Sequence, residues 1–223
     1  MAGTLILGID TATRVAGLAV GDAHRLWAEE TWYSVDTHTV ELAPRLDRMM
    51  RALGRTADDL SGVGVTLGPG SFTGLRIGLS VAKGLALSHG LPLVGIPTLD
   101  TLAWPHAGQR GPLWAVIQAG RGRLCAACYG RAADGLALVE GPLLVTLDEL
   151  AGRLGEGAFV CGELEAEETA ALRARLGSGL RLPRPAENLR RAGFLVELAR
   201  RRLANGEADD VETLAPLYLQ HPT

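Results

Sequence analysis

The chain has 223 residues, a formal net charge of -3, 47% hydrophobic residues and 21% charged residues. This length can bury one large core or two smaller ones, and the composition is that of an ordinary globular protein. The slightly negative charge argues against autonomous, electrostatically driven binding to nucleic acid. The opening "MAGTLILGID" has only a short apolar run, which predicts neither a signal peptide nor a membrane span. Three cysteines, an odd number, fit the reducing cytoplasm.

The first half of the chain predicts a mixed sheet with helical crossovers. The apolar runs "TLILGID" and "VAGLAVG" around "TATR" indicate a β-hairpin. Further strands are expected over residues 24–33, 63–68 and 91–96, and helices over 37–53, 73–89 and 98–104. Pro44 lies early in one helical pattern, so that helix either begins just before it or is kinked there.

The second half begins, like the first, with a predicted hairpin, which indicates two related lobes. "HAGQRGP" (106–112) is the expected boundary, giving an N-terminal lobe of residues 1–106 and a smaller C-terminal lobe of residues 107–223. Thr146 is expected to cap a short helix. A strand is expected over residues 158–162, helices over 165–176 and 185–205, and then an extended tail. The final helix or tail could pack back on the first lobe.

The glycine-rich stretch "LGPGSFTGLR" (67–76) raises the question of a phosphate loop. It is not a Walker A sequence, because no Lys-Ser or Lys-Thr follows the glycines. An anion could still meet free amides at residues 72–75, and Asp10 and Thr11 could face it from the end of the first strand. Asp10, Thr11, Gly70 and Ser71 are therefore candidate phosphate-side residues. The simpler reading is that these residues only shape two turns.

The helix after this stretch is apolar around most of its circumference, with only Arg76, Ser80 and Lys83 as a polar strip. Such a helix must be covered on two sides, one of which is the sheet. The second cover could be the 38–53 helix or another protein chain. The helix also holds three glycines, at a cost of about 1 kcal/mol each relative to Ala, so we expect close packing to compensate.

No catalytic or metal site is expected from the reactive side chains. The histidines show no metal-binding spacing, and Cys125, Cys128 and Cys161 are interpreted as core residues. The arginines of residues 190–202 are most simply a solvated helix face, with a minor RNA-facing patch as the alternative.

Three stretches resemble the bacterial TsaB (YeaZ) family: "ILGIDTATRVAGLAV", "VGVTLGPGSFTGLRIGLSVAKGLALSHGLPLVGIPTLDTLA" and "PLYLQ". The resemblance implies an α/β, actin-like (ASKHA, RNase H-like) two-lobed fold with mixed sheets flanked by helices. It also implies a non-catalytic role in making N6-threonylcarbamoyladenosine (t6A) at tRNA position 37. The implied partners are the catalytic paralogue TsaD and the ATPase TsaE, with a homodimer when TsaD is absent, and tRNA is met only through the complex.

At two sites the residues differ from those of the relatives, and both differences favour a chain that does not catalyse the reaction itself. TsaD-like proteins carry two metal-binding histidines where this chain has Thr98 and Leu102, and neither side chain can replace an imidazole. Relatives also place an aspartate where this chain has Gln118. We therefore expect no stably bound cofactor here, with ATP and a divalent metal in the partner subunits. The alternative is an ATP-binding or ATP-hydrolysing enzyme of the same fold acting on a small molecule.

In the family, the helices equivalent to residues 38–53 and 73–89 pack against matching helices of TsaD. This implies a set of partner-interface candidates: Leu42, Arg45, Leu46, Met49, Leu75, Arg76, Leu79 and Lys83.

Overall fold

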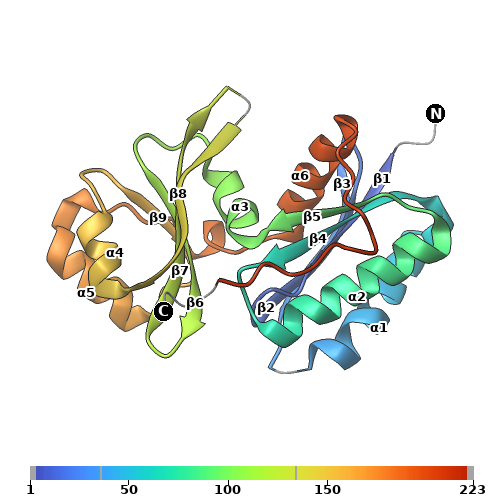
Figure 1. Cartoon of the computed structure of the whole chain (residues 1–223), viewed down its shortest axis with the longest axis horizontal. Coiled ribbons are helices and arrows are strands. Elements are labelled where there is room, and N and C mark those ends of the chain that lie inside the picture. The colour runs from blue at the N-terminus through green and yellow to red at the C-terminus, as the bar shows by residue number, and fades with distance from the viewer. Residues whose placement is uncertain (1–3, 36, 134, 220–223) are drawn as a thin grey trace. The chain divides into compact units, whose positions relative to one another are not determined.

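The computed structural model describes residues 4–35, 37–133 and 135–219. It divides into two compact units, each built on a mixed sheet flanked by helices (Figure 1). Unit 1 is formed by Met1–Thr101 and Arg191–Leu217, and unit 2 by Leu102–Arg190 and Tyr218–Thr223. Gln220, the last residue of "PLYLQ", lies outside the described residues.

The sheet of unit 1 has the strand order β3-β2-β1-β4-β5. The predicted hairpin is confirmed, because β1 pairs antiparallel with β2, while β1 and β4 pair in parallel. The third strand begins two residues later than expected, and the strand before the glycine-rich stretch begins three residues earlier. The strands are β1 (Leu5–Asp10), β2 (Val15–Gly21), β3 (Leu26–Tyr33), β4 (Leu60–Gly68) and β5 (Leu93–Pro97).

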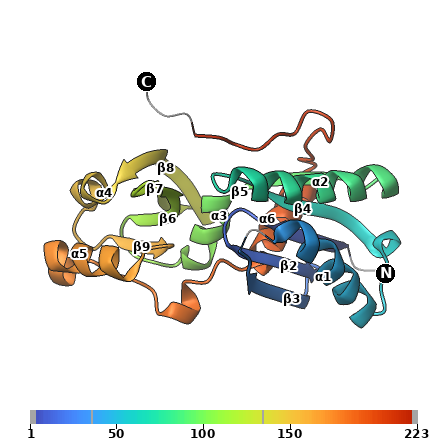
Figure 2. The same cartoon turned by 90° about the horizontal axis from the view of Figure 1, so that it is seen from below.

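Helices cover both faces of this sheet (Figure 2). α1 (His38–Ala52) and α2 (Phe72–His89) lie on one face, and α6 (Ala192–Ala204) lies on the other. The alternation along β1 explains this, because Leu7 and Ile9 belong to the core under α1 and α2 while Ile6 belongs to the core under α6. Pro44 lies inside α1, which begins at His38.

The segment after α6 runs back over unit 1, where it covers the outer edge of β5 and part of the core under α1 and α2. Asp209 donates its backbone N–H to the Leu93 carbonyl (2.8 Å), and its carboxylate accepts from the Gly95 N–H (2.7 Å) at the edge of β5. Arg202 donates to the Gly95 carbonyl at 2.8 Å. Further along, Val211 and Leu214 pack against the core under α1 and α2. Both α1 and this tail therefore help to cover α2.

The sheet of unit 2 repeats the first, in the order β8-β7-β6-β9. A hairpin, β6 (Leu113–Gly120) and β7 (Arg123–Ala132), is joined by β8 (Gly135–Thr146), and β6 pairs in parallel with β9 (Phe159–Gly162). Within the described residues, nothing in this sheet corresponds to β5. α3 (Thr98–Ala103) precedes this sheet, and α4 (Leu147–Arg153) and α5 (Ala166–Leu176) follow its strands. The capping box of Thr146 with Glu149 confirms the predicted start of α4.

The helix predicted over residues 185–205 is wrong in its first part. Pro185–Glu187 form only a short 3-10 turn, and α6 begins at Ala192. The segment between them is tied to the end of β9, because the Asn188 side chain bonds both the N–H and the carbonyl of Gly162. Among the described residues, no helix is both long and apolar enough to cross a membrane.

Candidate functional site

The phosphate-side candidates lie where the β1–β2 turn meets the loop between β4 and α2. Asp10 is 1% exposed, and its Oδ1 accepts from the Ala12 N–H (3.0 Å) and the Thr66 hydroxyl (3.1 Å). The buried Thr11 hydroxyl donates to the Gly74 carbonyl at 2.7 Å. Ser71 donates its N–H to the Ala12 carbonyl at 2.6 Å. The two turns are thus joined to each other by hydrogen bonds.

The amides at the start of α2 are partly used within the chain. Ser71 is the N-cap, its side chain accepting from the Gly74 N–H at 3.2 Å, and the Leu75 N–H donates to the Ser71 carbonyl. These bonds take two of the amides in the expected anion cradle at residues 72–75. Phosphate binding at this loop stays a prediction, and the geometry gives its residues a structural role.

Two of the three glycines in α2 are explained by close packing. A Cβ built on Gly74 would collide with the Thr11 carbonyl, and one built on Gly78 would collide with the Thr11 hydroxyl. The expectation of compensating packing is correct at both positions. At Gly84 the compensating packing stays a prediction, because a built Cβ meets none of the described residues within 4 Å. Gly84 is exposed, so no packing within the described chain accounts for it.

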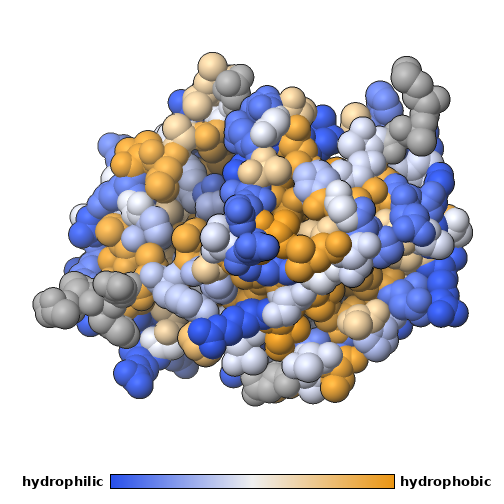
Figure 3. Space-filling model, turned by 45° about the vertical axis from the view of Figure 1, so that its right-hand side comes forward, coloured by the Kyte–Doolittle hydropathy of each residue, from blue (hydrophilic) through white to orange (hydrophobic). Residues whose placement is uncertain are grey.

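Gly84 lies on the wall of a groove of about 650 Å³ between the C-terminal halves of α1 and α2. Figure 3, which brings the right-hand side of Figure 1 forward, shows hydrophobic surface gathered in a band there. The groove is lined mainly by aliphatic side chains, among them Leu46, Met50, Val81 and Leu85. We call it the α1–α2 groove.

The charged side chains that line the α1–α2 groove are paired. Arg51 bonds Asp47 at 2.9 Å, Arg55 bonds Asp59 at 3.2 Å, and His89 bonds Asp58 at 2.8 Å. These pairs leave little net charge at the rim. The groove is therefore suited to apolar side chains rather than to a charged small molecule.

The structure separates the interface candidates into two groups. Leu42, Met49, Leu75 and Leu79 are buried inside unit 1, with exposures of 0–7%, and offer a partner almost no surface. Leu42 and Met49 belong to α1 and Leu75 and Leu79 to α2, and the sequence did not show which side of each helix faces the core. Leu46 lines the groove, Arg76 is exposed and stacks on the Phe72 ring at 3.6 Å, and Lys83 donates to the Glu212 carbonyl at 3.1 Å.

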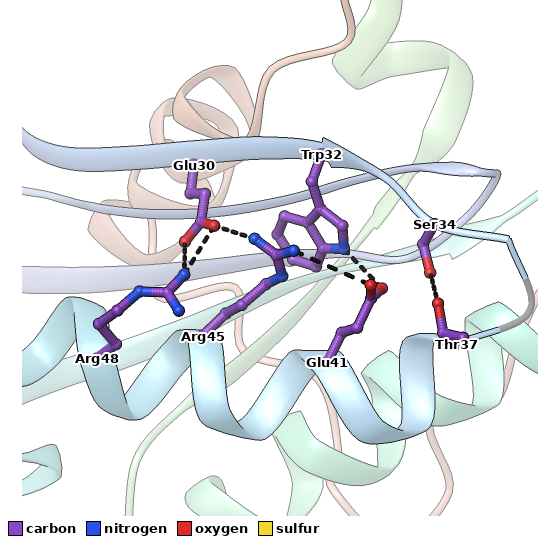
Figure 4. A network of polar contacts seen from close by, with 7 residues as sticks. All are labelled: Glu30, Trp32, Ser34, Thr37, Glu41, Arg45 and Arg48. Carbon is purple, nitrogen blue, oxygen red and sulfur yellow. Dashed lines mark hydrogen bonds and ion pairs between the residues drawn. The ribbon is translucent and has the colours of Figure 1, made fainter.

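Arg45 belongs to a polar network that fastens α1 to β3 (Figure 4). Its guanidinium lies over the Trp32 ring at 4.6 Å and forms an ion pair with Glu30. Glu41 accepts from the Trp32 indole N–H at 3.1 Å. Hydrogen bonding by Ser34, and to a lesser extent by Trp32, lowers the pKa of Glu41. The network holds one wall of the groove in place.

Thr98, Leu102 and Gln118, the positions at which this chain differs from its relatives, have structural roles. Thr98 and Leu102 are each at most 2% exposed. The Gln118 amide donates to the Glu163 carbonyl at 3.1 Å and to the Glu168 carboxylate at 2.7 Å. The cysteines are buried as expected, and burial raises the pKa of Cys125 to about 11. Among the described residues, no three His, Cys, Asp or Glu side chains gather as a metal site.

Comparison with known proteins decides the family. Residues 33–219 match a family model described as TsaD: tRNA N6-adenosine threonylcarbamoyltransferase. A protein of Escherichia coli named tRNA threonylcarbamoyladenosine biosynthesis protein TsaB is 35% identical over 139 residues, covering 59% of this chain and 57% of the relative. The chain belongs to the TsaB (YeaZ) family. The Bacillus subtilis TsaB is 33% identical over 124 residues, covering 56% of this chain and 54% of the relative. The chain thus spans just over half the length of these curated relatives.

Solved structures extend the likeness to the whole TsaB (YeaZ) fold. YeaZ from Pseudomonas aeruginosa has a TM-score of 0.81 at 22% identity, covering 97% of this chain and all of that one. A more distant likeness is to the activator of 2-hydroxyisocaproyl-CoA dehydratase from Clostridium difficile, with a TM-score of 0.54 at 13% identity, covering 92% of this chain and 98% of that one. The fold is that of the actin-like ATPases, and these identities bear on the fold alone.

Proposed function

We propose that this chain is a non-catalytic subunit of the complex that makes N6-threonylcarbamoyladenosine in tRNA. It binds a TsaD-type catalytic paralogue through the α1–α2 groove and acts together with a TsaE-type ATPase. Family membership supports the pathway. The observation that supports docking is the groove itself. Its surface is apolar, the charged side chains that line it are paired, and Gly84 lies exposed in its wall.

Gly84 supports this reading because an exposed mid-helix glycine costs about 1 kcal/mol relative to Ala. Among the described residues, none lies within 4 Å of a Cβ built at Gly84, so no contact there offsets that cost. A glycine without a Cβ permits the backbone of an opposing helix to approach closely. Without its paralogue, the same surface can pair with a second copy, since an isologous contact reuses one patch on both molecules.

The test is reconstitution with the TsaD-type and TsaE-type proteins of the same organism, ATP, tRNA and the threonylcarbamoyl donor. Modified nucleoside is measured by mass spectrometry after digestion. We expect product only when this chain is present, and none from this chain alone. Full activity without the chain, or product from the chain alone, would refute the proposal.

The alternative is an ATP-binding or ATP-hydrolysing enzyme of the same fold. Calorimetry with Mg-ATP separates the two. We expect no saturable heat from the isolated chain, because Asp10 Oδ1 and two of the four amides at residues 72–75 are occupied by internal bonds. Micromolar binding that disappears in Asp10→Ala, in a variant that still gives the native circular dichroism spectrum, would favour the enzyme.

A further inference from the structure

A second pocket of unit 1 lies at the opposite end of the sheet from Asp10. It has a volume of about 440 Å³ and is formed where β1, β4 and β5 begin, beneath the last turns of α6. Thr4 comes just before β1, Ser61 is the second residue of β4, and Pro92 comes just before β5. We call it the α6 pocket. Small-molecule sites have volumes of roughly 300–1,000 Å³, so its size fits a small ligand.

The walls of the α6 pocket are mostly apolar. Ile6, Pro92 and Leu203 supply aliphatic surface, and alanines and a glycine supply the rest, with two hydroxyls from Thr4 and Ser61. Leu203 lies tightly over the sheet, since a Cβ built on Gly62 would come within 2.6 Å of its Cδ1. Leu203 therefore forms a closely packed wall of the pocket.

The charged side chain in this lining is that of Arg200, which is half-buried. Two other arginines of this region are paired: Arg191, the N-cap of α6, with Glu29, and Arg202, on α6, with Asp209 and Glu207. Within residues 4–35, 37–133 and 135–219, no ion pair or hydrogen bond engages the Arg200 guanidinium. A half-buried cation against apolar walls gains most from an anionic partner.

The end of α6 does not compete for that cation. The backbone carbonyls of its last turn already accept hydrogen bonds from backbone N–H groups. The Arg201 carbonyl accepts from Asn205, and the Leu203 carbonyl accepts from Gly206. The Arg202 carbonyl accepts from both Asn205 and Glu207. The nearby carboxylates of Glu207 and Asp209 are engaged by Arg202. None of these groups pairs with the Arg200 guanidinium, whose charge is therefore available to a ligand in the pocket.

We propose that the α6 pocket binds a small organic carboxylate with a short apolar body. The carboxylate meets the Arg200 guanidinium, with the hydroxyls of Thr4 and Ser61 as further donors, and the apolar body lies between Ile6, Pro92 and Leu203. A single guanidinium matches the single charge of a carboxylate and would leave a phosphate dianion half neutralised. This site is independent of docking at the α1–α2 groove.

The experiment is an NMR titration of the full-length, ¹⁵N-labelled chain with hexanoate, and with 1-hexanol and acetate as matched probes. Hexanoate should shift the Arg200 Nε–H and the amides of Gly206 and Ala208 in a saturable way. We expect acetate and 1-hexanol each to bind at least about tenfold more weakly, since one lacks apolar surface and the other lacks charge.

Arg200→Gln should weaken the binding of hexanoate at least about tenfold. Arg14→Gln removes an exposed charge outside the pocket and should leave the affinity for hexanoate unchanged. Ala204→Trp, at an exposed pocket residue, should block the site without changing its charge. Equal binding of hexanoate and 1-hexanol, equal loss in both arginine variants, or no saturable shift at Gly206 and Ala208 would overturn the proposal.

Discussion

Gly84 and Gly78 occupy the same helix and differ in what surrounds them. Gly78 faces the Thr11 hydroxyl, while Gly84 faces open space in the α1–α2 groove. Both appear in the sequence as costly glycines inside a helix, and the sequence does not distinguish them. The distinction depends on how closely the β1–β2 turn approaches α2, which only the tertiary structure determines.

Ala at these two positions should have opposite effects. Gly84→Ala should raise the free energy of unfolding by about 0.5–1 kcal/mol, because the backbone is already helical and the added Cβ meets nothing. Gly78→Ala should lower it by about 1–3 kcal/mol, because the Cβ forces Thr11 to move. Urea unfolding measures both. A destabilising Gly84→Ala would show that position 84 is constrained from within the chain.

His106 is the second residue with a measurable consequence. It is 6% exposed, its Nε2 has no hydrogen-bond partner among the described residues, and burial lowers its pKa, against a weaker opposing effect of Glu187. The folded chain thus keeps His106 neutral at a pH where the unfolded chain, with a pKa of about 6.5, takes up a proton. Its contribution to stability is complete above about pH 6.5 and declines as the pH falls below it.

We therefore expect the free energy of unfolding to decrease between about pH 6.5 and pH 5, with a shallower slope in His106→Gln than in the wild type. Urea unfolding followed at several pH values measures these slopes. His24→Gln, at an exposed position in the turn after β2, is the control and should keep the wild-type slope. Identical slopes in all three proteins would contradict the role given to burial of His106.

At the scale of elements, the segment after α6 protects the edge of β5. The Gly95 N–H, its carbonyl and the Leu93 carbonyl are all bonded by Asp209 or Arg202. An uncovered edge would leave these backbone groups ready to pair with another chain. The tail is therefore part of the architecture of unit 1.

Asp209→Ala should lower the free energy of unfolding by about 1–3 kcal/mol, because the Gly95 N–H loses its acceptor and Arg202 loses one of its three partners. Glu207→Ala is the matched control, since its exposed carboxylate bonds the same arginine at 3.3 Å and should cost less than about 0.5 kcal/mol. Urea unfolding and limited proteolysis of the tail measure the difference. Equal losses of unfolding free energy in the two variants would contradict the role of Asp209 in capping the edge of β5.

The elements show what the sequence could predict. The hairpins, α2 and the Thr146 cap follow from local patterns of apolar residues and capping chemistry. β8 was missed, because its half-buried residues are interrupted by Gly141 and Pro142. The false helical start at residue 185 has a tertiary cause, the bonds of Asn188 to Gly162.

At the scale of the whole molecule, the two sheets repeat one strand pattern, and the α1–α2 groove, the proposed docking surface, belongs to unit 1. Docking through these two helices stays a prediction of the sequence, which could not distinguish their buried side chains from their exposed ones. Leu79 illustrates this, because it is 6% exposed and a charge there would disrupt the core rather than test docking. Gly84 and Ser80 are the better pair, being exposed on the same helix, with only Gly84 in the lining of the groove.

The most direct test is size-exclusion chromatography with light scattering of this chain mixed with its TsaD-type paralogue. The wild type and Ser80→Glu should form a heterodimer, while Gly84→Glu should place a carboxylate in the apolar groove and weaken the complex at least about a hundredfold. Circular dichroism confirms that each variant is folded. A Gly84→Glu chain that is folded and forms the heterodimer as well as Ser80→Glu would contradict docking through the α1–α2 groove.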